Sequence, residues 1–222
     1  MTMPRLATIA LILVLGPGAA GPAAQSGPVV RFGVVTDVHY ADIDPSGART
    51  YRESPAKLAE CVRVMNERQA EFVVELGDFK DQDKTPDPAR TRQYLERIES
   101  VLAGFHGPRY HVLGNHDVDS LSKQEFLGRV VNTGVVPNAT RYTFVRRGIR
   151  FVVLDANHKS DGTDYDRGNY EWADSNIYAA QLQWLRATLA SSREPVVVMV
   201  HQQLDGTGAN YVKNAADVRA VL

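Results

Sequence analysis

The feature that most constrains this chain is a repeated arrangement in which a short polar cluster follows directly on an apolar run typical of a buried β-strand. The clusters are Asp37-Val38-His39, Gly77-Asp78, Gly114-Asn115-His116-Asp117 and a lone His201. Strand-like runs alternating with amphipathic helical patterns predict an α/β sheet with several parallel neighbours. Ligands gather at the carboxyl ends of strands in such sheets, so we expect the four clusters to meet there.

The rest of the chain follows the same alternation, with a single long polar interruption. Apolar runs and helical periodicity predict strands near 29–36, 72–76, 110–113, 142–145, 149–154 and 196–200, and helices near 54–68, 94–102, 126–130 and 182–189. The short segment between the runs 142–145 and 149–154 predicts that these two strands form a β-hairpin. The polar stretch 157–176 predicts a surface loop near the site, because long loops in compact domains are often functional.

Composition supports one domain and limits the classes of partner. The 222 residues are 44% hydrophobic, enough for one sizeable core. The formal net charge is −1 and no long basic run occurs, so binding to nucleic acid or to an anionic membrane is not indicated. Cys61 is the only cysteine, and its helical spacing with Leu58, Val62 and Met65 predicts that it is buried. Composition does not indicate the oligomeric state.

The N-terminus has the pattern of a secretory signal peptide. Arg5 precedes the apolar stretch 6–15, and small residues follow it up to Ala24. The apolar stretch is too short to cross a hydrocarbon layer ~30 Å thick, which argues against stable membrane insertion. We therefore expect a signal peptide over 1–24, an exported (periplasmic or secreted) protein, and a mature domain over 25–222.

The first two clusters offer ligands for divalent cations. Asp37 and His39 are two residues apart, so in an extended strand they share a face and both could reach one cation. Asp78 follows the turn-permitting Gly77, and its carboxylate could bridge two cations. Taken singly, these residues are equally compatible with ordinary surface and turn positions. Asp81 could support the same site or cap a turn.

The third cluster is the most specific of the four. The amide oxygen of Asn115 is a neutral, hard ligand suited to a divalent ion. His116 could face a substrate, with Asp117 orienting its ring and stabilising its protonated form. A simple polar turn would explain Gly114 and Asn115 but not the adjoining His-Asp pair. His201 alone is equally compatible with a metal ligand and with a buried, hydrogen-bonded histidine.

In this order, the four clusters resemble the motifs of the calcineurin-like metallophosphoesterase superfamily, and the resemblance covers about residues 29–201. It implies a mixed α/β fold, a sandwich of two mixed β-sheets flanked by helices. It also implies a dinuclear centre of divalent metal ions (Mn, Fe or Zn), with hydrolysis of phosphate esters or phosphoanhydrides by a metal-activated water.

The resemblance also assigns roles by position. It implies that Asp37 and His39 bind the first metal, that Asn115 and His201 bind the second, and that Asp78 bridges the two. The histidine that follows Asn115 would contact the phosphate and assist the leaving group.

Three segments resemble the manganese-dependent ADP-ribose/CDP-alcohol diphosphatases more narrowly: 37–42 with Tyr51-Arg52, 111–116 and 181–185. They imply a small nucleoside-diphosphate-linked substrate, whereas segments 170–176 and 205–211 do not follow that group. A nonspecific secreted phosphomonoesterase or phosphodiesterase is the alternative. The superfamily's closing Gly-His-x-His segment does not occur before Leu222, so we expect a fold incomplete at its C-terminus. Two explanations stay open: the chain is part of a longer protein, or it is a non-catalytic metal-binding remnant.

Overall fold

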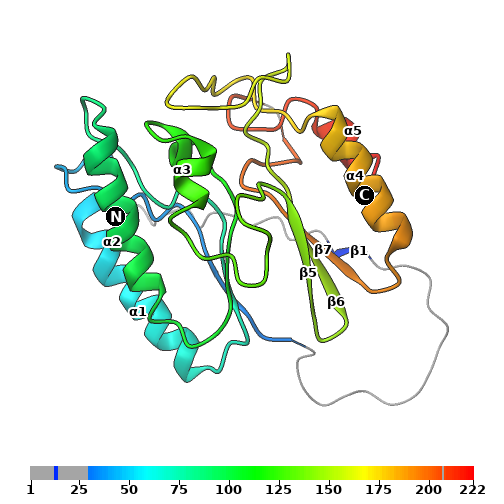
Figure 1. Cartoon of the computed structure of the whole chain (residues 1–222), viewed down its shortest axis with the longest axis horizontal. Helices are drawn as coiled ribbons and strands as arrows, with labels where there is room; N and C mark the ends of the chain where they lie inside the picture. The colour runs from blue at the N-terminus through cyan, green and yellow to red at the C-terminus, as the bar shows by residue number, and fades with distance from the viewer. Residues whose placement is uncertain (1–12, 15–29, 207) are drawn as a thin grey trace, which may run out of the picture.

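The computed structural model describes residues 13–14, 30–206 and 208–222. Two β-sheets pack face to face between two layers of helices, α1 (Ser54–Glu67) and α2 (Pro88–Leu102) on one side and α4 (Ala179–Ser191) and α5 (Ala215–Arg219) on the other (Figure 1). The predicted two-sheet sandwich flanked by helices is confirmed. Apart from Leu13–Val14, the predicted signal peptide over 1–24 lies outside the described residues.

The first sheet carries three of the four polar clusters. Its strands are β2 (Gly33–Val35), β3 (Val73–Glu75) and β4 (Arg109–His111), all parallel and in the order β2-β3-β4. Side chains alternate between its faces. Val73 packs with the α1 and α2 side chains, whereas Val74 packs against the other sheet. Because the strands are parallel, their carboxyl ends lie at the same edge.

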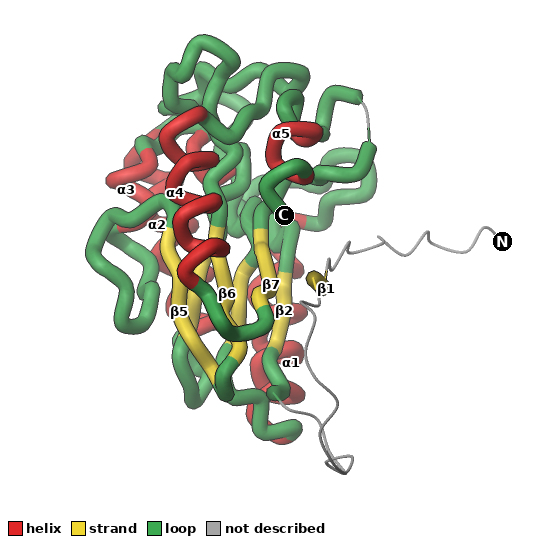
Figure 2. Tube along the Cα trace, turned by 90° about the vertical axis from the view of Figure 1, so that its right-hand side faces the viewer, coloured by secondary structure: helices red, strands yellow, loops and turns green. Residues whose placement is uncertain are grey.

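The second sheet is mixed and has the order β1-β7-β6-β5. The hairpin of β5 (Tyr142–Arg146) and β6 (Ile149–Val153) is antiparallel, and β6 runs parallel to β7 (Val196–Met199). The short strand β1 (Leu13–Val14) pairs antiparallel with β7. Figure 2 shows β5, β6 and β7 side by side below the loops. The fourth cluster, at His201, therefore comes from the sheet opposite to the other three.

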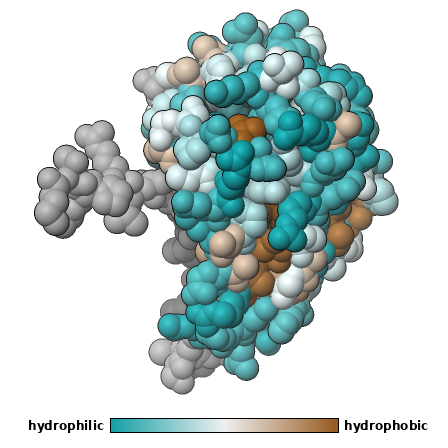
Figure 3. All heavy atoms as spheres, turned by 90° about the vertical axis from the view of Figure 1, so that its left-hand side faces the viewer, coloured by the Kyte–Doolittle hydropathy of each residue, from teal (hydrophilic) through white to brown (hydrophobic). Residues whose placement is uncertain are grey.

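Aromatic rings fill the space between the two sheets. Tyr110 from the first sheet stacks on Phe144 of the second at 3.7 Å between ring centroids, and Phe72 meets Phe151 edge to face at 5.0 Å. The outer face on the side of α1 and α2 is mainly hydrophilic, with small apolar areas between the polar side chains (Figure 3). Among the described residues, no helix has the length and apolar character needed to cross a membrane.

The predicted burial of Cys61 is wrong, because its side chain is exposed. Leu58 and Val62 are the buried residues of α1. Successive residues of a helix are about 100° apart, so Cys61 points well away from Val62 while Met65 stays closer to the apolar side. The periodic pattern identified the correct helix face but included a residue at its margin.

One buried ion pair supports the ends of the first sheet. Lys80 is fully buried, and its Nζ contacts Asp119 and donates to the carbonyl of His116 at 2.6 Å.

Replacing Lys80 with methionine is expected to lower the free energy of unfolding by ~3–5 kcal/mol, because Asp119 is left buried without its counter-charge. Chemical denaturation measures this effect. Lys57→Met on the exposed side of α1 is the control and should change stability far less; equal changes would contradict the prediction.

Candidate metal centre and active site

The loops that follow β2 and β3 hold three predicted ligands in an unusual backbone conformation. Asp37, His39 and Asp78 have φ values of 54°, 47° and 58°, in the left-handed region. Non-glycine residues there cost of order 1–3 kcal/mol each and are concentrated at functional sites. Two hydrogen bonds fasten the loops together, from the Asp37 amide to the Gly77 carbonyl at 3.1 Å and from the His39 amide to the Asp78 carbonyl at 2.9 Å.

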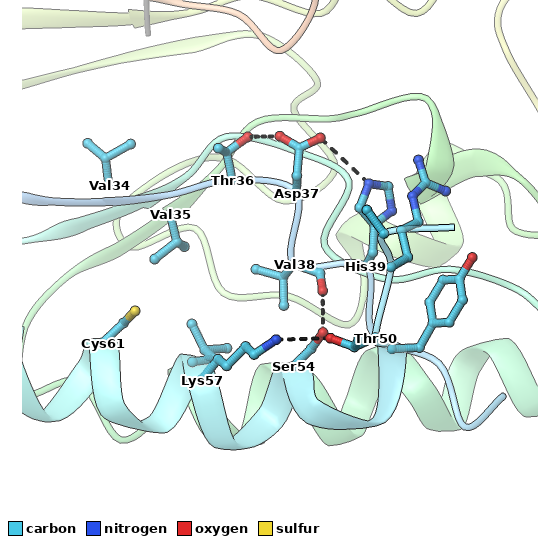
Figure 4. A pocket seen from close by; sticks show the side chains of 14 residues that line it. Val34, Val35, Thr36, Asp37, Val38, His39, Thr50, Ser54, Lys57 and Cys61 are labelled. Atoms are coloured by element: carbon cyan, nitrogen blue, oxygen red, sulfur yellow. Dashed lines mark hydrogen bonds and ion pairs between the residues drawn. The ribbon is translucent and has the colours of Figure 1, made fainter. Parts of the chain in front are cut away.

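These loops place Asp78 between two imidazoles. Its Oδ2 lies 3.3 Å from Nε2 of His201 and 3.7 Å from Nε2 of His39. Asp37 Oδ1 lies 3.6 Å from the same nitrogen of His39, and Figure 4 shows these two side chains facing each other at the end of β2. The possible ligand atoms of Asp37, Asp78 and His201 all lie within 4.8 Å of one another. Four of the five predicted ligands therefore lie together, with the side chains of Asp37, His39 and His201 near the Asp78 carboxylate.

A hydrogen bond at His201 and an ion pair at His39 determine which ring nitrogen of each histidine faces Asp78. His201 Nδ1 lies 2.8 Å from the Leu76 carbonyl, which can only accept, so the hydrogen is on Nδ1 and Nε2 is directed into the site. His39 Nδ1 lies 3.2 Å from Asp81 Oδ2, again leaving Nε2 toward Asp78. Metal-binding histidines commonly donate their second ring nitrogen to a carbonyl or carboxylate in this way.

Asn115 completes the group from the end of β4. It stands just before the short 3₁₀ helix His116–Val118, is buried, and lines a cavity together with Asp37, Asp78 and His201. Its Nδ2 has no hydrogen-bond partner within the described part of the chain. The neighbouring Gly114 is required here, because a Cβ at this position would collide with the backbone nitrogen and Oδ1 of Asp78.

The structure corrects the predicted partner of His116. Its Nδ1 lies 2.5 Å from Oδ1 of Asp81, so Asp81 orients the ring. The Arg49 guanidinium donates to Asp81 Oδ2 at 3.2 Å and lies 3.4–3.5 Å from Nε2 of His116. Arg49 also lines the cavity and was not predicted. No pattern around it marks it in the sequence, because its contacts depend on how the loop before α1 folds back.

Asp117 has a different role from the predicted one. Its carboxylate accepts backbone N–H groups of Asp78, Phe79 and Gly114 at 2.8–3.0 Å. It therefore fastens the loop after β3 to the loop after β4, and makes no hydrogen bond to the His116 ring among the described residues. The prediction that Asp117 orients His116 is wrong, because the 3₁₀ turn directs the two adjacent side chains to different neighbours.

The electrostatics of the site follow from close pairs of carboxylates and imidazoles. Burial disfavours a charge on His201, but the carboxylate of Asp78 outweighs it and raises the pKa of His201 to about 10. Burial is likewise outweighed at His39, where Asp37 and then Asp81 raise the pKa to about 9. In return, the pKa of the Asp78 carboxyl lies well below its usual range despite its burial, chiefly because of His201.

The cavity beside these residues has a volume of about 230 Å³. Its other wall comes from the predicted polar loop, which contributes Tyr165, Tyr170 and Trp172. The expectation that this loop lies near the site is therefore confirmed. A second cavity, of about 410 Å³, lies between the end of β2 and α1 and shares Asp37 and Arg49 with the first (Figure 4).

A further acidic and histidine cluster, Asp155, His158 and Asp164, has metal-like spacing but is already filled. Lys123, at the start of α3 (Lys123–Leu127), places its Nζ 2.7 Å from Asp155 and 2.6 Å from Asp164. An ammonium among these groups occupies the place a cation would take. This cluster therefore fastens the polar loop to α3.

Comparison with known proteins identifies similar sequences. The chain is 34% identical over 143 residues to the manganese-dependent ADP-ribose/CDP-alcohol diphosphatase of Arabidopsis thaliana, a match covering 61% of this chain and 44% of that protein. A protein of the same name from Danio rerio is 25% identical over 247 residues, covering 88% and 76%. The chain thus spans less than half the length of the Arabidopsis relative.

A solved structure shares the fold. The crystal structure of a dimetal phosphatase from Danio rerio aligns with a TM-score of 0.74 and 23% identity, covering 88% of this chain and 77% of that one. The model of the calcineurin-like phosphoesterase family matches residues 30–222, which include all the predicted site residues. The chain therefore belongs to the calcineurin-like phosphoesterase family.

Proposed function

We propose that this protein is a metal-dependent hydrolase of phosphate esters or phosphoanhydrides, acting on small nucleoside-diphosphate-linked molecules. The observation that carries the proposal is the position of Asp78, whose Oδ2 lies between the Nε2 atoms of His39 and His201. His116, held by Asp81 and flanked by Arg49, stands beside this group. The names of the diphosphatase relatives support the substrate class.

The residues present fit a pair of divalent metal ions. Carboxylate, imidazole and amide oxygen suit Mn, Fe or Zn. Asp37 and His39 would hold one ion, Asn115 and His201 the other, and Asp78 both. Asn115 is buried and its side chain makes no hydrogen bond within the described residues, so its amide oxygen is available to such an ion. When bound, such a pair supplies an activated water and neutralises charge on the phosphoryl oxygens.

The chain's own residues would donate the proton, bind the phosphate and position the loops that carry the ligands. Asp81 holds Nδ1 of His116, so Nε2 is the atom that can contact the phosphate and protonate the leaving oxygen. Arg49, close to that nitrogen and exposed to the cavity, places a permanent positive charge beside the phosphate. Asp117 maintains the distance between the loops that carry Asp78 and Asn115.

Metal binding is expected to release about two protons at pH 8. Without metal, His39 and His201 are protonated at this pH, because their pKa values are about 9 and about 10. Ligation requires neutral imidazoles, so both protons leave, and the affinity rises as pH approaches those values. Calorimetric titration with Mn²⁺ in two buffers of different ionisation enthalpy counts the protons. His201→Gln should release about one and His106→Gln, at an exposed position, about two; proton-free binding would contradict the assignment.

Rates on three substrates test the proposed function. With Mn²⁺, we expect hydrolysis of ADP-ribose and CDP-choline with kcat/KM well above that for a simple aryl phosphate. Equal rates on all three would favour the alternative of a nonspecific phosphomonoesterase. No metal-dependent hydrolysis of any of them would refute the proposed function.

We also propose that the protein is exported. The support is the pattern of residues 1–24, in which a basic residue, an apolar stretch and small residues follow one another. N-terminal sequencing of the protein recovered outside the cytoplasm of an expressing bacterium should begin between Gly21 and Ser26. Recovery only from the cytoplasm, with Met1 intact, would refute this.

A further inference from the structure

We propose that Tyr170 and Trp172 form an aromatic platform that stacks against the nucleobase of the substrate and so determines its specificity. This inference rests on the proposed phosphoesterase function and concerns the part of the substrate beyond the phosphate. Both residues belong to the polar loop between β6 and α4.

The two rings stand at the wall of the cavity, next to the reacting group. The Trp172 ring centroid lies 5.1 Å from that of His116 and 5.1 Å from that of Tyr170, which meets it edge to face at 83°. Both side chains line the cavity that contains Asp78 and Asn115. Trp172 is 45% exposed, so part of its ring is accessible beside the polar site. An apolar face adjoining a phosphate site suits a substrate with a flat apolar part.

The loop is held in place before any substrate arrives. The amide of Gly168 donates at 2.9 Å to the carbonyl of Val118, the last residue of the 3₁₀ helix that begins at His116. Gly168 has φ +83°, and a Cβ there would lie 2.6 Å from the Asp119 carbonyl oxygen, so only glycine allows this approach. The buried Tyr165 donates its hydroxyl hydrogen to the Glu171 carbonyl at 2.7 Å. These contacts connect the platform to the segment that carries His116.

The shape and charge of the site favour a planar group over a cationic one. Recognition of a quaternary ammonium uses a cage of several ring faces around the cation. Here Tyr170 covers one side of Trp172 edge to face, which leaves a platform and not an enclosure. The guanidinium of Arg49 lines the same cavity and would repel a cationic group of the substrate. Stacking of a base on an aromatic side chain needs only one open ring face.

Fluorescence of Trp172 tests the platform directly. The chain has two tryptophans, so Trp184→Phe, on the distant helix α4, leaves Trp172 as the only one. In this variant, with Mn²⁺ held constant, AMP is expected to quench the emission. Ribose 5-phosphate, which has the same sugar and phosphate but no base, should cause much less quenching. The comparison isolates the base, because both probes place a phosphate beside His116.

The affinities of Trp172 variants for AMP and for ribose 5-phosphate give a second test of the platform. Trp172→Leu is expected to weaken AMP binding by about 10-fold and ribose 5-phosphate binding by less than about twofold, whereas Trp172→Phe should retain most of the AMP affinity. Equal quenching by both probes, or an equal loss of both affinities, would overturn the platform and leave Trp172 as a support for His116. If AMP quenches selectively while no phosphoester is hydrolysed, the platform stands and the proposed hydrolase function fails. Hydrolysis without selective quenching overturns the platform alone.

Discussion

Asp78→Asn is expected to lower kcat/KM by at least ~10²–10³-fold and to reduce the number of tightly bound metal ions below two. The change keeps the size of the side chain but removes the charge that His39 and His201 both face. The amide also replaces one oxygen by a nitrogen that cannot bind a cation. Elemental analysis after gel filtration counts the metal, and initial rates on ADP-ribose give the activity.

Asp217→Asn, on the exposed surface of α5, is the matched control because it removes the same charge at a residue that lines neither cavity. It should leave both the metal content and the rate unchanged. The circular dichroism spectrum of Asp78→Asn should match that of the parent protein, since Oδ1 can still accept the His116 amide at this position. Full activity of Asp78→Asn with two bound metals would refute the bridging assignment.

The sequence predicted the fold well where periodicity was strong. The hairpin predicted at 142–145 and 149–154 is observed as Tyr142–Arg146 and Ile149–Val153, because alternating side chains must enter the space between the sheets. The first strand is shorter than predicted, Gly33–Val35 within 29–36, since pairing with β3 is limited to those three residues. The placement of clusters at strand ends was also predictable, because it follows from parallel strands alone.

The partners of the site residues were harder to predict. Asp117 is next to His116 in sequence, yet Asp81 contacts its ring. That contact depends on the parallel pairing of β3 with β4, which brings the loops at 77–81 and 114–117 together. Arg49 reaches the same histidine from a third loop. Register and loop conformation decide these contacts, and neither leaves a periodic signal in the chain. The metal roles of Asp37, His39, Asp78, Asn115 and His201 stay predictions.

His116→Gln is expected to reduce kcat/KM for an alkyl phosphate ester by about 10²–10⁴-fold, the range for loss of a general acid. Glutamine can still hydrogen-bond to the phosphate but cannot supply a proton to the leaving oxygen. The metal content should not change, because the side chain of His116 faces Asp81 and Arg49 and is not one of the five proposed ligands. Steady-state rates on the metal-loaded variant measure the loss.

The leaving group separates proton donation from phosphate binding. An aryl phosphate with a strongly acidic phenol leaves without protonation, whereas an alkyl phosphate must release a strongly basic alkoxide, so the loss of rate in His116→Gln should be at least ~10-fold smaller on the aryl phosphate than on the alkyl phosphate. His106→Gln, at an exposed position that lines neither cavity, is the control and should affect neither substrate. Equal losses on both substrates would show that His116 stabilises the phosphoryl group itself, and the proton would then have to come from solvent. A leaving-group-dependent loss, together with unchanged metal content, would assign the acid to Nε2 of His116, the ring atom that Asp81 leaves free.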